Sequence, residues 1–479
     1  MNKPIILVLG TSSGAGKTTL ATAICRILSN EGLTVRPFKA FNMSLNSLAA
    51  DDGSEIARSQ WLQAQACRSG TSWHNNPVLV KPESGGRSML ILRGQVAATG
   101  KFSEISENWF NEEKSAVIEA INYLSDESDV IVAEGSGSPA EINMFDRDIA
   151  NTFLLENFDL AAILVADIER GGVYASIAGT VSLMKQSEKV RWIAINKMHG
   201  DVSFIESANR EIYNITGKPV IGTIPFHKYS LPGEDMMDYL TENRKSPEIL
   251  LIKYPYWENY SDIDSLSYYA GVTYITSPVR TMFENCSLII LPGSKNVLED
   301  LRFLRLVGLD KLIIEFSNSK NVIGICGGYQ ILGRIIRGQS GSEVEDRQVY
   351  GLGLLECQTN YEKKKTVKPV SYRFNLSTGI SSEGKGYEIH YGSVTTAENP
   401  LLEVNGEFEG SISSNGKIFG TNVHGILENK EFLSYLLSRK LTGNYYDHIE
   451  EQIELLSKNV KNSLDLTGVL SYARTGQIP

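Results

Sequence analysis

Cys326 and His424 are residues of the types that form a thiol nucleophile and its base, although they lie far apart in the sequence. Cys326 ends a short apolar run, residues 322–325, and is followed by Gly327 and Gly328. A buried packing role is the commoner one for an arbitrary cysteine. The glycine pair and a distant His-Gly partner favour catalysis here, because a nucleophilic cysteine typically has a sequence-distant histidine. We therefore predict that Cys326 is the nucleophile and that His424 moves the proton.

A strand, a tight turn and a helix are needed to position Cys326. Residues 322–325 read as a buried strand, the glycine pair permits a turn too tight for a Cβ, and residues 329–336 carry an apolar helical stripe. Cys326 then lies at a helix N-terminus, where unpaired N–H groups favour the thiolate and can hold an oxyanion. His390 is the alternative base, but a histidine within a strand is more often packed or directed at a substrate.

A second chemical motif occupies residues 10–19, between the apolar run 5–9 and a helical pattern that extends to Leu28. Backbone N–H groups of such a loop cradle phosphate oxygens, while Lys17 can reach the β and γ phosphates and Thr18 can hold Mg²⁺. The alternative is a glycine-rich turn that binds nothing, which the strand before, the helix after and the Gly-Lys-Thr sequence disfavour. We predict ATP and Mg²⁺ as ligands. The residues predicted to contact the nucleotide are Gly10, Thr11, Gly14, Gly16, Lys17, Thr18 and Thr19.

Polar residues follow other predicted strands at the end where an α/β sheet places ligand contacts. Glu134 comes directly after residues 129–133 and is predicted to bind Mg²⁺, directly or through water. For Asp146 and Asp148, structural pairing with Arg147 is favoured over a catalytic role. Further candidates for ligand contacts, each with a turn, a solvated helix face or a surface ion pair as the alternative, are Asn42, Ser44, Asn46, Ser47, Glu55, Gln60 and Arg170.

The composition excludes several classes of protein. A net charge of −10 and a pI near 5.3 argue against a nucleic-acid-binding protein. The five cysteines include no Cys-x-x-Cys pair, so we expect neither a zinc site nor a disulfide framework. No apolar run approaches membrane-spanning length. Residues 4–9 do not have the pattern of a secretory signal peptide, because this short apolar run is followed directly by the glycine loop. We therefore expect a cytoplasmic protein with neither nucleic acid nor membrane as a partner.

The length of 479 residues is too great for one hydrophobic core and suits two large domains. Apolar runs of strand length, separated by segments of helix length, predict α/β domains with parallel sheets covered by helices on both faces. The polar stretch 232–246 marks a boundary. We predict an ATP-binding synthetase domain at 1–235, an amidotransferase domain at 248–445, and a helical extension with a tail at 446–479.

The segments GICGGYQ at 324–330 and GTNVHG at 420–425 together resemble the class I glutamine amidotransferase domain of the cobyric acid synthase family. Ile426 stands where many class I amidotransferases have an acidic residue, so the residue that orients His424 is not identified.

The N-terminal half resembles the same family. Its glycine loop has Thr11 where the first glycine is usual, as in the dethiobiotin synthetase-like subgroup. The most specific match is EGSGSPAEIN at 134–143, followed by DRDIAN at 146–151. Phe41 stands in place of the family's usual glutamine, which removes one polar contact.

The resemblance implies a P-loop synthetase domain joined to a class I amidotransferase-like domain, in which Gly293 or Ser294 supplies a further oxyanion N–H group. It also implies glutamine and a corrinoid as substrates. The reaction is ATP-dependent, glutamine-hydrolysing amidation of the remaining carboxylates of adenosylcobyrinic acid a,c-diamide, which gives cobyric acid in cobalamin biosynthesis.

The residues alone lead only to a glutamine-dependent amidoligase that works through an acyl phosphate, because ammonia released by a thiolate site can be consumed at an ATP site. Two alternatives stay open. One is a related amidoligase, such as cobyrinic acid a,c-diamide synthase or a cell-wall amidating enzyme. The other is a non-enzymatic P-loop switch with a degenerate amidotransferase domain.

Overall fold

A computed structural model of the chain describes residues 3–83, 86–233, 247–338, 348–374 and 382–478. The chain forms two domains, and each is described by itself. The predicted boundary at 232–246 falls, from residue 234 on, outside the described residues. No helix within the described ranges combines the length and the apolar character needed to cross a bilayer.

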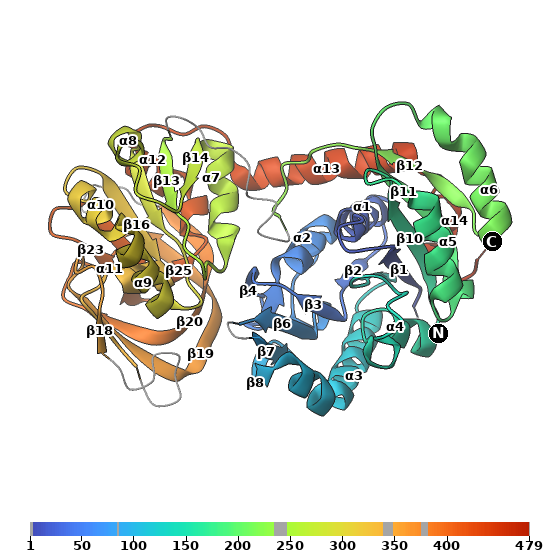
Figure 1. Cartoon of the computed structure of the whole chain (residues 1–479), viewed down its shortest axis with the longest axis horizontal. Helices are drawn as coiled ribbons and strands as arrows, with labels where there is room; N and C mark the ends of the chain where they lie inside the picture. Colours follow the sequence, from blue (N-terminus) through green and yellow to red (C-terminus); the bar gives the residue numbers. More distant parts are fainter. Residues whose placement is uncertain (1–2, 84–85, 234–246, 339–347, 375–381, 479) are drawn as a thin grey trace. The chain divides into compact units, whose positions relative to one another are not determined.

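The N-terminal domain contains a six-stranded sheet in which all strands run parallel (Figure 1). Every residue of its neighbouring strands β1 and β9 is buried, which explains their continuous apolar runs, since helices cover both faces of such a sheet. Because β1 and β9 are neighbours, the loops that follow them open at the same edge. In sheet order the strands are β12 (Val220–Pro225), β11 (Val190–Met198), β10 (Ala161–Asp167), β1 (Ile5–Gly10), β9 (Val130–Glu134) and β2 (Val35–Phe38).

A small second sheet in this domain was not predicted from the sequence. Its strands follow the order β3 (Phe41–Met43), β6 (Val78–Pro82), β7 (Arg87–Leu92) and β8 (Gln95–Lys101). Apolar residues of β6 and β7 form one cluster with residues of α3. The helices of this part of the chain are α1 (Lys17–Asn30), α2 (Arg58–Cys67), α3 (Phe102–Asp126), α4 (Thr152–Asn157), α5 (Val173–Leu183) and α6 (Glu206–Thr216).

The C-terminal residues 446–478 pack with the N-terminal domain, whereas the sequence analysis set them apart as an extension. They form most of α13 (Tyr445–Ser463) and α14 (Thr467–Thr475). The buried guanidinium group of Arg26 in α1 pairs with Glu454 at 2.7 Å and also with Glu450. One face of α13 is buried through Ile449, Ile453, Leu456 and Val460.

The C-terminal domain has its own six-stranded sheet, parallel except for its last strand. Together with the parallel sheet of the N-terminal domain, it confirms the predicted α/β class. In sheet order the strands are β14 (Val272–Ile275), β13 (Ile249–Ile252), β15 (Leu288–Leu291), β16 (Asn321–Ile325), β24 (Ile418–Thr421) and β23 (Ser411–Ile412). The helices are α7 (Asp264–Tyr269), α8 (Arg280–Asn285), α9 (Val297–Val307), α10 (Leu309–Phe316), α11 (Gly327–Leu332) and α12 (Lys430–Leu437).

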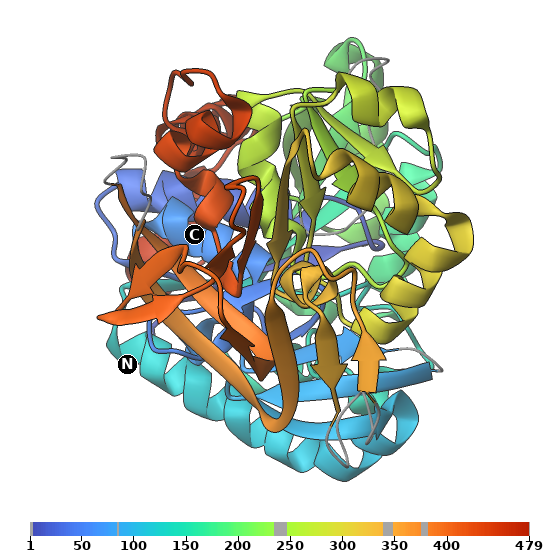
Figure 2. The same ribbon diagram turned by 90° about the vertical axis from the view of Figure 1, so that its left-hand side faces the viewer.

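A second, mostly antiparallel sheet of this domain is dominated by the long neighbouring strands β19 (Cys357–Phe374) and β20 (Glu383–Thr396), which lie side by side in both views (Figures 1 and 2). The short strand β25 (Val423–His424) pairs with β20 and places His424 opposite Tyr387. The remaining strands are β17 (Ile335–Arg337), β18 (Gln348–Tyr350), β21 (Leu402–Val404) and β22 (Glu407–Glu409).

Residues 45–53, which the sequence analysis assigned to the N-terminal domain, belong to the C-terminal domain. We call them the inserted segment. It contains the short strand β4 (Ser47–Ala49), and the side chains of Leu48 and Ala50 are buried. The local sequence does not indicate that residues 45–53 belong to the C-terminal domain. This assignment depends on contacts with residues more than 200 positions away.

Candidate active sites

Cys326 lies in a sharp turn between β16 and α11. Its backbone has φ 52° and ψ −112°, a conformation that is strained for a residue with a side chain and that clusters at functional sites. The two glycines after it are required by close packing. A Cβ on Gly327 would lie 2.6 Å from the Ser294 nitrogen, and one on Gly328 would overlap the Leu291 carbonyl group. The turn therefore presents the thiol where the sequence pattern predicts it.

His424 is held by a carboxylate that the sequence analysis did not identify. Its Nδ1 lies 2.7 Å from Oδ2 of Asp262, and Oδ1 of Asp262 accepts a hydrogen bond of 2.6 Å from the Gly425 N–H group. The imidazole ring stacks on Tyr387, with ring centroids 5.1 Å apart and an angle of 9° between the planes. Asp262 and His424 are both buried. Asp262 thus fixes the ring and its tautomer.

The other ring nitrogen of His424, Nε2, does not contact Asp262, and the sulfur of Cys326 neighbours the imidazole ring. Nε2 is buried and makes no hydrogen bond of regular geometry among the described residues. Burial lowers the pKa of His424, but the charge of Asp262, the hydrogen bond to it and the neighbouring Cys326 sulfur outweigh this effect and raise the pKa to about 10. A histidine with this pKa is protonated at neutral pH and stabilises a neighbouring thiolate.

The loop after β15 has backbone N–H groups that face the turn at Cys326. Those of Gly293 and Ser294 have no acceptor within the part of the chain that the structure describes. The loop is fixed by the Tyr254 hydroxyl group, which donates to the Pro292 carbonyl, and by Asp300, which accepts a 2.6 Å bond from Ser294 Oγ. Free N–H groups beside a nucleophile can stabilise an oxyanion, so this loop suits the role that the sequence analysis gave it.

His390, the alternative base, has other partners. Its Nδ1 lies 2.9 Å from the Gly392 carbonyl oxygen, and its Nε2 lies 3.3 Å from Glu388. Glu388 also pairs with Lys368 at 3.3 Å. Cys326 Sγ instead lies 3.6 Å from the backbone carbonyl of the neighbouring Ile389. The geometry therefore pairs Cys326 with His424 rather than with His390.

In the N-terminal domain, the loop between β1 and α1 is shaped by Gly16 and Lys17. Gly16 has φ 101°, and a Cβ there would overlap the Asn196 side chain, which donates a 3.0 Å hydrogen bond to the Ala15 carbonyl. The ammonium group of Lys17 donates to the carbonyls of Ser12, at 3.1 Å, and Gly137, at 2.9 Å. It lies between the loops that follow β1 and β9, where phosphate groups would be received.

Glu134 is a buried carboxylate that three side chains of this domain contact. It is 1% exposed and accepts a 2.7 Å bond from the Thr18 hydroxyl group, a 2.9 Å ion pair from Lys39 and a 2.5 Å bond from the Gln63 amide. Gln60, one of the predicted polar contacts, in turn donates to Gln63 at 3.1 Å. Sequence reasoning missed Lys39 and Gln63, although Lys39 follows directly on β2 at the ligand edge of the sheet.

A hydroxyl and a carboxylate oxygen this close are suitable ligands for a hard cation such as Mg²⁺. Among the described residues no cluster of three or more His, Cys, Asp and Glu side chains could hold a metal by itself. A cation at Thr18 and Glu134 would therefore depend on phosphate oxygens and water for its remaining ligands, which is how Mg²⁺ is usually bound together with a nucleotide.

Several other predicted contacts have structural partners. Glu55 pairs with Lys81 at 2.9 Å, and both side chains are buried. Asn42 donates a 3.1 Å hydrogen bond to Ser59 Oγ. Asn46 and Ser47 belong to the inserted segment, and the Phe41 ring is half-buried in β3.

The loop after β9 corrects one prediction. Asp148 caps α4 by accepting hydrogen bonds from the backbone N–H groups of Asn151, at 2.9 Å, and Thr152, at 3.0 Å. Asp146 is exposed, and its carboxylate lies 3.8 Å from the Lys185 ammonium group. The pairing of Asp146 and Asp148 with Arg147, expected from the sequence, is therefore not formed. Arg170 is exposed.

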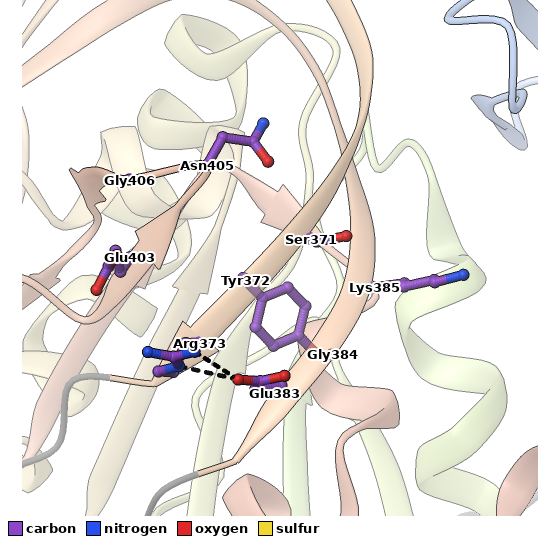
Figure 3. A pocket seen from close by; sticks show the side chains of 9 residues that line it. All are labelled: Ser371, Tyr372, Arg373, Glu383, Gly384, Lys385, Glu403, Asn405 and Gly406. Atoms are coloured by element: carbon purple, nitrogen blue, oxygen red, sulfur yellow. Dashed lines mark hydrogen bonds and ion pairs between the residues drawn. The ribbon is translucent and has the colours of Figure 1, made fainter.

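A hollow of about 450 Å³ lies on the surface of β19, β20 and β21 (Figure 3). Arg373 and Glu383 pair across it at 2.7 Å, and both side chains are exposed. The hollow contains neither Cys326 nor His424. It is lined by Ser371, Tyr372, Arg373, Glu383, Gly384, Lys385, Glu403, Asn405 and Gly406.

Both domains match family models. The CobB/CobQ-like glutamine amidotransferase domain matches residues 248–432, and the CobQ/CobB/MinD/ParA nucleotide binding domain matches residues 6–236. Among solved structures, the signal recognition particle receptor FtsY from Elizabethkingia anophelis in complex with GDP is 15% identical, with a TM-score of 0.29. That match covers 48% of this chain and 58% of FtsY.

Three relatives are similar over nearly their whole length. The probable cobyric acid synthase of Thermoplasma acidophilum is 44% identical, over 98% of this chain and 99% of that protein. That of Picrophilus torridus is 47% identical, over 97% and 98%. The cobyric acid synthase of Clostridium perfringens is 38% identical, over 98% and 99%. The chain belongs to the cobyric acid synthase family of glutamine-hydrolysing amidoligases.

Proposed function

We propose that the chain uses ATP and the amide nitrogen of glutamine to convert the remaining side-chain carboxylates of adenosylcobyrinic acid a,c-diamide into amides, giving cobyric acid. The proposal rests on the presence of two sites in one chain. The C-terminal domain has Cys326 with His424 and Asp262. The N-terminal domain has the phosphate loop with Thr18 and Glu134. The full-length similarity to cobyric acid synthases supports the corrinoid as the acceptor.

Glutamine hydrolysis begins when the Cys326 thiolate attacks the side-chain amide carbon. The carbonyl oxygen becomes an oxyanion held by the N–H groups of Gly293 and Ser294. Protonated His424 gives its proton to the leaving nitrogen, so that the C–N bond breaks and NH₃ departs from a glutamyl thioester. His424, now neutral, takes a proton from water, whose oxygen attacks the thioester and releases glutamate and the thiolate.

The synthetase domain makes the acceptor reactive. A carboxylate does not react with ammonia, because oxide would have to leave. Transfer of the γ-phosphoryl group of ATP to a carboxylate oxygen gives an acyl phosphate and ADP, and attack of NH₃ on its carbon then expels phosphate and forms the amide. Lys17 neutralises charge on the transferred phosphoryl group. Thr18 and Glu134 would hold Mg²⁺, which would supply further positive charge at the phosphates.

A labelling experiment tests this function. The purified protein is incubated with ATP, Mg²⁺ and glutamine that carries a heavy isotope in its amide nitrogen, together with cobyrinic acid, its a,c-diamide or the adenosylated a,c-diamide. Mass spectrometry should find several labelled amides in the product of the adenosylated a,c-diamide. Labelling of cobyrinic acid at only two carboxylates would instead identify an a,c-diamide synthase, and no labelled corrinoid would reject the proposed acceptor.

A further inference from the structure

The imidazole ring of His424 is held at its edge and covered on one face. At the edge, Oδ2 of Asp262 lies 2.7 Å from Nδ1. One hydrogen bond does not fix the plane of the ring, because the imidazole can still tilt about the line that joins the two atoms, and the torsion that sets this plane has only broad preferences. The ring of Tyr387 lies within 9° of parallel to the imidazole, with centroids 5.1 Å apart. It therefore restricts the tilt that Asp262 leaves open.

The distance between the two rings is set by the backbone. Tyr387 stands opposite His424 where β20 and β25 pair as antiparallel strands, so the two side chains lie on the same face of the sheet. The strands approach closely at this point, since a Cβ on Gly386 would lie 2.3 Å from the His424 carbonyl oxygen. A larger residue at position 386 would separate the strands and, with them, the rings.

The hydroxyl group of Tyr387 is held by Ser261. The two hydroxyl oxygens lie 2.7 Å apart and share a hydrogen bond, and both side chains are buried. Ser261 directly precedes Asp262 in the short 3-10 helix η7 (Tyr260–Ile263). This helix thus supports the imidazole of His424 at two places, through Asp262 at the edge and through Tyr387 on the face.

The strand that carries Tyr387 also contacts the nucleophile. The Cys326 thiol group lies 3.6 Å from the carbonyl oxygen of Ile389, two residues further along β20. His424 and Cys326 therefore both contact neighbouring positions of a single strand. A tilt of the imidazole would change its direction relative to a sulfur atom that β20 keeps in place, and small misplacements of reacting groups lower the rate of a reaction strongly.

Other titratable groups lie near the imidazole. Burial lowers the pKa of the imidazole, whereas Asp262, from η7, and Cys326, from the turn after β16, raise it. Tyr372 of β19 lies farther out, and its own pKa is raised by burial and by the charges of Glu428 and Asp262. The face of an aromatic ring attracts a cation within about 6 Å of its centroid, so the ring of Tyr387 also favours the protonated imidazole.

We infer that Tyr387 and Ser261 are positioning residues of the glutamine site. Tyr387 keeps the imidazole of His424 in the plane in which it exchanges protons, and Ser261 keeps Tyr387 in place through its hydroxyl group. The inference rests on the glutamine-hydrolysing half of the proposed function and is independent of the acceptor. Substitutions should lower kcat rather than raise KM, because these side chains contact the histidine and each other.

The test is glutamate release by the full chain as a function of pH, together with the rate at which iodoacetamide alkylates Cys326. Alkylation follows the thiolate fraction and needs no turnover, and mass spectrometry of peptides separates Cys326 from the other cysteines. Tyr387→Leu removes the aromatic face, Tyr387→Phe removes only the hydroxyl group, and Ser261→Ala removes its partner. The matched controls are Phe283→Leu and Ser317→Ala, which change another buried aromatic ring and another buried serine hydroxyl group of the same domain.

We expect Tyr387→Leu to lower kcat by about 10- to 100-fold, with KM within about threefold of the parent value. Its alkaline limit should move down by about 0.5 to 1 pH unit, and alkylation of Cys326 should need a higher pH, because the protonated imidazole has lost a stabilising neighbour. Tyr387→Phe should keep the alkaline limit. Tyr387→Phe and Ser261→Ala should each lower kcat by about three- to tenfold, and the double variant should lose no more than either one. Both controls should behave like the parent chain.

The inference is overturned if Tyr387→Leu keeps its alkaline limit and a kcat within about threefold of that of Phe283→Leu. It is also overturned if the losses of Tyr387→Phe and Ser261→Ala multiply in the double variant, because Ser261 then does not act through Tyr387. This second comparison decides even if urea unfolding shows that Tyr387→Leu does not fold.

Failure of the proposed function gives a different pattern. If the acceptor is another molecule, the variants keep their order in glutamate release while no corrinoid becomes amidated. If the parent chain releases no glutamate, the pH dependence of Cys326 alkylation still separates Tyr387→Leu from Phe283→Leu, and equal profiles would overturn the inference.

Discussion

Replacement of Asp262 by asparagine tests the arrangement around His424 most sharply. A carboxylate accepts both from Nδ1–H of His424 and from the N–H group of Gly425, whereas a carboxamide has only one acceptor oxygen. In Asp262→Asn the carboxamide oxygen can accept the hydrogen bond from the Gly425 N–H group only if the NH₂ group faces Nδ1 of His424. That contact favours the tautomer with hydrogen on Nε2, which cannot take a proton from Cys326.

The magnitude follows from the pKa of His424. The pKa of His424 rises from 6.5 to about 10, which favours its protonated form by at most about 5 kcal/mol, at about 1.4 kcal/mol for each pH unit. Asp262 supplies the larger favourable contributions to this rise. In Asp262→Asn the positive charge of His424 should therefore be lost at neutral pH. The comparable exchange in a serine protease lowers kcat about 10⁴-fold. Because a thiol needs less activation than a hydroxyl, we expect a loss of about 10²- to 10⁴-fold.

The pH dependence has a definite sign. A group whose pKa is raised by folding stabilises the fold fully below its unfolded pKa and loses that effect as the pH rises through the folded value. The His424 contribution should thus be complete below about pH 6.5 and disappear by about pH 10. Urea unfolding should show the parent chain losing stability across this window, and Asp262→Asn should have a flatter profile.

The assay is glutamate release as a function of pH, with ammonia-driven amidation as the check on folding. Asp310→Asn, in α10 of the same domain, is the matched control. If Asp262→Asn hydrolyses glutamine within about threefold of the parent rate and its alkaline limit stays near pH 10, Asp262 does not orient His424.

Three further predictions concern the remaining site residues. Lys17→Ala should abolish ATP-dependent amidation yet leave some glutamine hydrolysis, because the lysine serves only the phosphate site; equal loss of both activities, with an unchanged circular dichroism spectrum, would contradict this. His424→Ala should prevent the glutamyl thioester seen by mass spectrometry of the protein and His390→Ala should not, and the opposite outcome would reverse the assignment. Glu134→Gln should raise the Mg²⁺ concentration for half-maximal amidation by about tenfold or more, whereas an unchanged titration would place the cation elsewhere.

The predictable part of the two sites lies in short, local patterns. The turn at Cys326 and the loop before Lys17 each join a strand to a helix, and the glycines at both places are required by backbone conformation or close packing within a few residues. Glu134 was also predictable, because residues that follow buried parallel strands collect at one edge of the sheet.

The parts that were missed depend on contacts between distant segments. Asp262 lies 162 positions before His424, in a short 3-10 helix with no motif of its own. Ser47 looked like a ligand-contacting turn residue, but its partner Asn259 lies in the other half of the chain. The burial of one face of α13 depends on its packing with the N-terminal domain, and no local signal shows which domain that will be.

We propose that ammonia is the only product that the glutamine site must supply to the synthetase site. Cys326→Ala tests it most directly. Glutamine-supported amidation should disappear, and ammonium salt at high pH should restore it, with a rate that follows the concentration of free NH₃ because only the neutral amine has a lone pair. The corrinoid should carry the same amides as before. If the folded variant binds ATP and yet forms no amide at any NH₃ concentration, the thiol or its thioester is needed for synthesis itself, and the glutamine site supplies more than ammonia.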